Sequence, residues 1–186
     1  MKFKTKDLVF MAFYITLALA LEYLSKMIPF EMPFGGKLEL HVIALFAVSF
    51  HLGWWKGGLT AILVFITETM LGLNSWLYAP GQIFLDYILP LLACGMASLC
   101  PKVGKNNVYA GVVLGMLVKY ASHVLVGVWY WFPEGTAAWS LDAWVYSFGY
   151  NLTYCLPTLI VAVIVAPLLV MKLKNTRPTE FVGIKD

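Results

Sequence analysis

Residues 152–171 read LTYCLPTLIVAVIVAPLLVM and contain no Asp, Glu, Lys or Arg. A helix needs about 20 mostly apolar residues to cross the hydrocarbon core of a bilayer, and this stretch has that length. The full sequence of 186 residues follows the same trend, with 61% apolar residues, 12% charged residues and a mean hydropathy of +0.79. Soluble domains carry about twice that share of charge. The sequence therefore predicts an integral membrane protein.

Six apolar segments follow one another along the chain, separated by short breaks rich in Gly, Pro, Asn and charged residues. We place them at residues 7–28, 38–53, 57–73, 80–100, 107–132 and 140–172. Because no linker divides the chain, we expect residues 1–186 to form a single all-α domain, a bundle of six transmembrane helices. The first segment is too long for a secretory signal, and no small-residue cleavage site follows it.

The distribution of Lys and Arg predicts the orientation of the bundle. With the N-terminus inside, the outer side carries Lys26 and Lys37, Lys119 lies within the fifth segment, and ten of the 13 cations fall on the cytoplasmic side. Those ten are Lys2, Lys4, Lys6, Lys56, Lys102, Lys105, Lys172, Lys174, Arg177 and Lys185. Cytoplasmic loops carry such an excess, so we expect both termini in the cytoplasm. The net charge of +3 then reflects topology and does not indicate nucleic-acid binding.

Several ionisable side chains lie where a bilayer should exclude them: Glu22, His41, His51, Glu68, Asp86, Lys119 and His123. Each is a candidate for a functional site or for a buried partner, such as a carboxylate paired with Lys119. For Glu22, His41 and His51, near segment ends, we favour a structural role. The three cysteines, Cys94, Cys100 and Cys155, have no metal-ligand spacing, so we expect them to pack and predict no metal site.

Asp86 and His123 are interpreted as functional because of their surroundings. Asp86 follows Gln82 by one turn and precedes Tyr87, while His123 and Trp131 share a helical face with Lys119. Five of the seven tryptophans fall on the outer side: Trp76, Trp129, Trp131, Trp139 and Trp144. Part of this is the aromatic belt of any membrane interface. A carboxylate beneath aromatic rings would also suit a flat organic cation.

The sequence lacks several chemical motifs. It has no phosphate-binding Gly-rich loop ending in Gly-Lys-Ser/Thr, no metalloprotease His-Glu pair and no arguable Ser-His-Asp set. We therefore expect neither an enzyme nor an ATPase, but a binding subunit that relies on partners. Ala12, Thr16 and Ala20 form a stripe of small residues that could dock a partner helix or pack within the bundle.

Five motifs occur in a specific order: MPFGG at 32–36, GGLTA at 57–61, FLDYI at 84–88, KYASHV at 119–124 and YSFGYNLTY at 146–154. In these motifs, over nearly its whole length, the chain resembles the thiamine-specific S components of energy-coupling-factor transporters. The resemblance implies high-affinity capture of extracellular thiamine at a bacterial cell membrane. Delivery would use a transmembrane coupling protein and two ATPases, with no cofactor in this chain and ATP used only by the partners.

The same resemblance implies the ligand-binding residues, which carry over to Asp86, Tyr87, His123, Trp131, Tyr146, Asn151 and Trp76. Asp86 would complement the thiazolium charge or the aminopyrimidine donors, and Trp131 and His123 would stack on the ligand. Tyr146 and Asn151 would hydrogen-bond the pyrimidine edge. They are five residues apart, about 140° around an ideal helix, so the ligand would have to span the side of that helix unless the helix starts irregularly. The first outer loop would act as a lid.

Two alternatives stay open at this stage. An S component for another vitamin or for a thiamine precursor would need similar pyrimidine-binding groups. A proton-coupled carrier or a membrane enzyme could instead use Asp86, Lys119 and His123, because titratable groups inside a bundle can support either chemistry.

Overall fold

The computed structural model describes residues 4–101 and 107–173. Within these ranges the chain forms helices joined by loops and has no strand, only one isolated bridge between Glu31 and Lys37. The helices are α1 (Thr5–Met27), α2 (Val42–Leu52), α3 (Trp54–Met70), α4 (Pro80–Ile83), α5 (Leu89–Gly95), α6 (Asn107–Tyr130) and α7 (Leu141–Leu173). Short 3-10 turns lie at Pro33–Gly35 and Ala97–Leu99. The predicted all-helical fold is confirmed.

The helices fall in the six predicted segments in order, but the fourth segment is not one helix. It divides into α4, a π-helical turn at Phe84–Ile88, and α5. Among the described residues, α1, α6 and α7 are long and apolar enough to cross a membrane by themselves, while α2 is a shorter apolar helix. Only Gly53, with φ of +90°, separates α2 from α3, so the predicted break at residues 54–56 is already helical.

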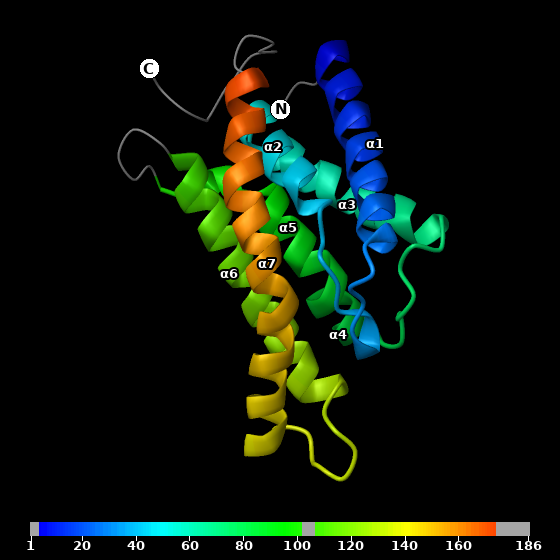
Figure 1. Cartoon of the computed structure of the whole chain (residues 1–186). Coiled ribbons are helices and arrows are strands. Elements are labelled where there is room, and N and C mark those ends of the chain that lie inside the picture. Colours follow the sequence, from blue (N-terminus) through cyan, green and yellow to red (C-terminus); the bar gives the residue numbers. More distant parts are fainter. Residues whose placement is uncertain (1–3, 102–106, 174–186) are drawn as a thin grey trace.

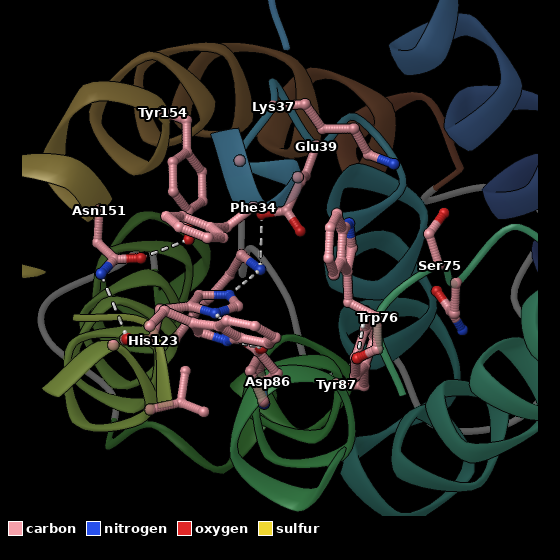
Figure 2. A pocket seen from close by; sticks show the side chains of 18 of the residues that line it. Phe34, Lys37, Glu39, Ser75, Trp76, Asp86, Tyr87, His123, Asn151 and Tyr154 are labelled. Atoms are coloured by element: carbon pink, nitrogen blue, oxygen red, sulfur yellow. Dashed lines mark hydrogen bonds and ion pairs between the residues drawn. The ribbon is translucent and has the colours of Figure 1, made fainter. Parts of the chain in front are cut away.

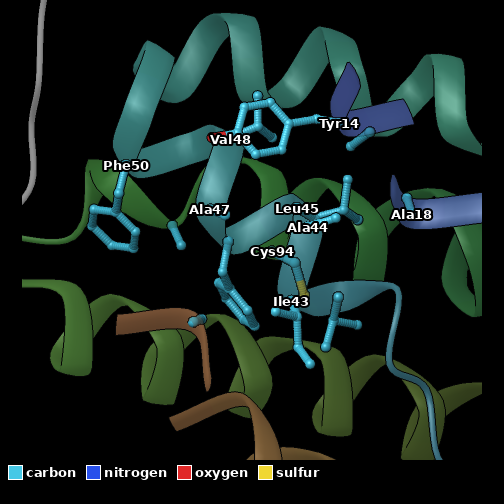
Figure 3. Close-up of a cluster of buried hydrophobic side chains, with 14 of the residues drawn as sticks. Tyr14, Ala18, Ile43, Ala44, Leu45, Ala47, Val48, Phe50 and Cys94 are labelled. Carbon is cyan, nitrogen blue, oxygen red and sulfur yellow. The ribbon is translucent and has the colours of Figure 1, made fainter. Parts of the chain in front are cut away.

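Helix α2 forms the centre of the bundle. Every one of its residues is buried, and it packs against α1, α3, α5 and α7. Figure 3 shows its side chains surrounded by Tyr14 and Ala18 of α1 and by Cys94 of α5. A helix with apolar residues on every face is stable only inside a protein or a bilayer; α2, in which Ser49 and His51 are the two polar residues, is covered by neighbouring helices.

Buried polar contacts attach α1 to the core. Lys56 Nζ of α3 lies 2.9 Å from Asp7 Oδ2, and Tyr14 Oη lies 2.8 Å from His51 Nδ1 of α2. His51 thus has the structural role expected of it. Ala12, Thr16 and Ala20 are all exposed, so this stripe does not pack within the described bundle.

Two glycines allow helices to approach closely. A Cβ on Gly57 of α3 would lie 2.0 Å from the carbonyl oxygen of Gly95 in α5, and a Cβ on Gly127 of α6 would lie 2.1 Å from Ser147 Oγ of α7. Neither position has room for a side chain. Small residues at membrane helix interfaces commonly serve this purpose.

The start of α1 and the end of α7 lie at one end of the bundle, and three of its loops extend toward the other end. In Figure 1, α1 begins and α7 ends near the top, whereas the loops at 28–41, 71–79 and 131–140 reach the lower half together with α4. Because the six segments are an even number, the start of α1 and the end of α7 fall on the same side of the bundle. The three loops and α4 surround the cavity described next.

Candidate binding site

A cavity of about 370 Å³ lies between the first loop, the π-helical turn, α6 and α7. Its volume is in the range of small-molecule sites. The structure brings together all seven residues predicted from the sequence, since the lining includes Trp76, Asp86, Tyr87, His123, Trp131, Tyr146 and Asn151. The lining also holds five carboxylates and three lysines, an excess of negative charge that favours a cationic ligand.

Asp86 lies in the π-helical turn and has three partners. Its Oδ2 accepts hydrogen bonds from Gln82 Nε2 at 2.8 Å and Trp131 Nε1 at 3.2 Å, and its Oδ1 lies 2.9 Å from His123 Nδ1. Single π-helical turns inside helices are frequent at functional sites, because the extra residue redirects a side chain. The carboxylate is 17% exposed and faces the cavity in Figure 2.

A chain of charged and polar groups continues from Asp86 through the bundle. Lys119 Nζ lies 2.8 Å from His123 Nε2 and 2.7 Å from Glu39 Oε2. Because an ammonium group can only donate, Nε2 must accept and Nδ1 must carry the proton that it donates to Asp86. The expected carboxylate partner of Lys119 is Glu39, which sequence reasoning missed. Its position at the start of the second apolar segment was the available signal.

Aromatic rings cover the cavity around Trp131. Phe34 stacks on it with ring centroids 5.7 Å apart and an interplanar angle of 28°, and Trp76 and Tyr78 contact it edge-on. Tyr87 donates a hydrogen bond of 3.4 Å to the carbonyl of Trp76. Phe34, which has φ of +64°, was not among the predicted residues. It belongs to the MPFGG motif, which we had interpreted only as part of a lid.

The loop that carries Phe34 is attached to α7. Tyr150 Oη donates to the carbonyl of Pro33 and accepts a hydrogen bond of 3.1 Å from the amide of Gly36. Tyr146 stacks on Tyr150 with centroids 5.7 Å apart. The loop therefore closes the cavity through Tyr150, a residue that the sequence did not distinguish from its neighbours.

Asn151 makes contacts mainly within the protein. Its Oδ1 accepts a hydrogen bond of 2.6 Å from Tyr154, and its Nδ2 donates to the carbonyls of Ser147 at 2.8 Å and His123 at 3.3 Å. Tyr154 was missed by sequence reasoning. Tyr146 and Asn151 both line the cavity although they are separated around α7, because the cavity extends along the side of that helix.

A helical bundle that encloses a polar, aromatic cavity near one end defines a membrane protein that binds small molecules. The sequence assigns the chain to a family within that class: residues 8–177 match the model of the family described as thiamine transporter protein (Thia_YuaJ), and the chain belongs to this family.

One curated relative supports the assignment, and one solved structure shows the same fold. The thiamine transporter ThiT of Bacillus subtilis (strain 168) is 32% identical over 179 residues, which cover 88% of this chain and 90% of the relative. A solved structure of ThiT from Listeria monocytogenes matches with a TM-score of 0.68 over 92% of this chain and 97% of that chain. At 19% identity, the second match shows the shared fold. The family and the Bacillus relative are named as transporters, in agreement with the prediction of a membrane protein that is not an enzyme.

Proposed function

We propose that this protein is the thiamine-binding S component of an energy-coupling-factor transporter. The observation that carries the proposal is Asp86, a carboxylate held by three donors in an aromatic cavity that has an excess of negative charge. Thiamine is a flat heteroaromatic cation with an aminopyrimidine, and such a site offers both charge pairing and stacking. Membership of the thiamine transporter family supports the same ligand.

The seven cavity residues would divide the recognition of thiamine between them. Asp86 would accept hydrogen bonds from the aminopyrimidine or pair with the thiazolium, while Trp131 and His123 would supply aromatic surface. The rest of the cavity wall around the ligand would be formed by Tyr146, Asn151, Tyr87 and Trp76. Since Phe34 already stacks on Trp131, a ligand ring between them would need a centroid separation of about 7 Å, twice a normal contact distance. The lid would therefore shift outward by roughly 1 Å on binding.

Transport would require partners that this chain does not contain. A transmembrane coupling protein could dock on the exposed stripe of Ala12, Thr16 and Ala20, and two ATPases would use ATP, so this subunit would need no cofactor. The bundle would lie in the plasma membrane of a bacterium with both termini in the cytoplasm and the cavity facing outward. This orientation is supported by the distribution of Lys and Arg.

The test is a titration of the purified protein with thiamine, in which tryptophan fluorescence reports binding. Trp131 and Trp76 line the cavity, so we expect saturable quenching. Asp86→Asn removes the charge but keeps the shape, and we expect affinity to fall about 10- to 100-fold, the value of one charge-assisted hydrogen bond or ion pair. Asp142→Asn, at an exposed position of α7, is the matched control and should bind normally.

Two results would contradict the proposal. One is tighter binding of a neutral vitamin or of the isolated pyrimidine precursor than of thiamine. The other is accumulation of thiamine in vesicles by this chain alone under a proton gradient, which would make it a carrier that uses Asp86, His123 and Lys119.

A further inference from the structure

A second cluster of ionisable groups lies apart from Asp86 along the same cavity. Glu22 of α1, His41 at the start of α2 and Glu68 of α3 each offer one ligand atom, and these atoms lie within 4.8 Å of one another. All three residues are at least 95% buried. Lys37 pairs with Glu22 of this cluster, and Figure 2 shows Lys37 and Glu39 across the cavity from Asp86.

The cluster is incompletely paired. His41 Nδ1 is 2.8 Å from Glu22 Oε2, and Glu22 also pairs with Lys37 through its other oxygen. Glu68 has weaker contacts. Its Oε1 lies 3.7 Å from His41 Nδ1, and no group among the described residues donates a hydrogen bond to this oxygen. A buried carboxylate oxygen without a donor costs free energy, so the contacts within the protein leave this site unsatisfied.

We propose that Glu22, His41 and Glu68 form a binding site for a divalent first-row transition-metal ion, such as Zn²⁺ or Mn²⁺. Two carboxylates and one imidazole are a common ligand set for these ions. Ligand atoms about 2.1 Å from a metal are at most about 4.2 Å apart, so the cluster needs to contract by only about half an ångström. Carboxylate oxygens and one nitrogen make the alkaline-earth ions Mg²⁺ and Ca²⁺ the poorer choice.

The charges around the cluster are compatible with a divalent ion. Two carboxylates and the Lys37 ammonium sum to a single negative charge with His41 neutral, and the ion would reverse that sign. Because the three residues line the cavity, solvent or a ligand oxygen could complete the coordination shell. The metal would connect α1, α2 and α3 at the point where the lid residue Lys37 contacts α1.

The experiment measures metal bound to the purified protein without thiamine, so its outcome is independent of the proposed ligand. After removal of any affinity tag, the protein is equilibrated with Zn²⁺ or Mn²⁺, passed through a desalting column and analysed for metal. We expect about one ion per chain for the wild type, and at least tenfold weaker binding for Glu68→Gln and for His41→Gln. Glu134→Gln, an exposed position, makes the same chemical change and should leave metal binding unaltered.

A second measurement uses the wild-type chain, so it does not depend on whether the variants fold. The sequence has only three histidines, so an electron spin-echo spectrum of bound Mn²⁺ should show nitrogen coupling from one imidazole. Absence of retained metal, or the absence of nitrogen coupling from the bound Mn²⁺, would overturn the proposal. His41 would then be a protonated bridge between two carboxylates. Equal metal content in wild type, Glu68→Gln and His41→Gln would overturn it as well.

Discussion

Lys119 is a cation in the interior of the bundle, with a side chain that is 1% exposed. The charge of Lys119 is stabilised by Glu39, which precedes α2, and by the imidazole of His123 on the same helix as Lys119. A buried ion pair rarely adds much net stability, because both charges lose their hydration. Removing one partner is different, since the remaining charge then stays buried and unpaired.

We therefore expect Lys119→Met to be strongly destabilising. Loss of one partner of a buried pair costs about 3–5 kcal/mol, which corresponds to a fall in melting temperature on the order of 10 °C for a chain of this size. The buried thiols of Cys94 and Cys155 provide the measurement, because a thiol-reactive dye reaches them only on unfolding.

Two further variants test whether that loss of stability comes from the unpaired charge. The double variant Lys119→Met with Glu39→Gln removes both charges and should recover most of the loss. Lys172→Met, at an exposed position near the end of α7, should melt like the wild type. If the double variant is no more stable than Lys119→Met alone, the Glu39 contact does not stabilise Lys119.

At the scale of elements, the cavity depends on how closely α6 and α7 approach. Gly127 lies opposite Ser147, whose hydroxyl donates a hydrogen bond of 2.8 Å to the carbonyl of Val124. Ser147 also lies 3.1 Å from the amide nitrogen of Asn151. The close contact therefore positions both His123 and Asn151, which lie one turn from Gly127 and Ser147 on their helices.

Gly127→Ala should separate α6 from α7. In an exposed helix, replacing Gly by Ala stabilises by about 1 kcal/mol, but here the new methyl group would overlap Ser147 Oγ, and overpacking costs about 1–3 kcal/mol. We expect a lower melting temperature and weaker thiamine binding together. Gly149→Ala, in α7 with open space around it, is the control and should be neutral or stabilising. Equal behaviour of the two variants would contradict the importance of the close approach.

For the whole molecule, local signals in the sequence predicted the helical segments and marked Asp86 and His123, whereas the resemblance to S components, and not local spacing, implied the full set of seven cavity residues. Hydropathy locates the segments, and spacing places His123 and Trp131 on one face. The position of Glu39 opposite Lys119 depends on the relative rotation of α2 and α6, which a single sequence does not determine. The same holds for Glu22, His41 and Glu68, which come from three helices. The division of the fourth segment near Asp86 was also missed, because a π-helical turn has no clear signal in hydropathy.

The orientation of the whole molecule decides which solution the cavity faces. The loops at 71–79 and 131–140, which contribute residues to the cavity lining, lie toward one end of the bundle, whereas α1 begins and α7 ends at the other (Figure 1). The distribution of Lys and Arg along the sequence predicts a cytoplasmic N-terminus, although six of the ten cations behind that prediction lie outside the described residues. Because α1 begins at the end opposite the cavity, we expect the cavity to open to the cell exterior. Single cysteines can test this in a Cys100→Ser background, because the other two native cysteines are buried.

A membrane-impermeant maleimide added to intact cells should label Ala137→Cys, in an exposed position of the 131–140 loop. Thr5→Cys, exposed at the start of α1, should react only after the cells are permeabilised. Permeabilised cells, in which both positions should react, control for the intrinsic reactivity of each thiol. The reverse pattern would place the cavity on the cytoplasmic side. Capture of an extracellular ligand would then be impossible for this chain, whatever its affinity for thiamine.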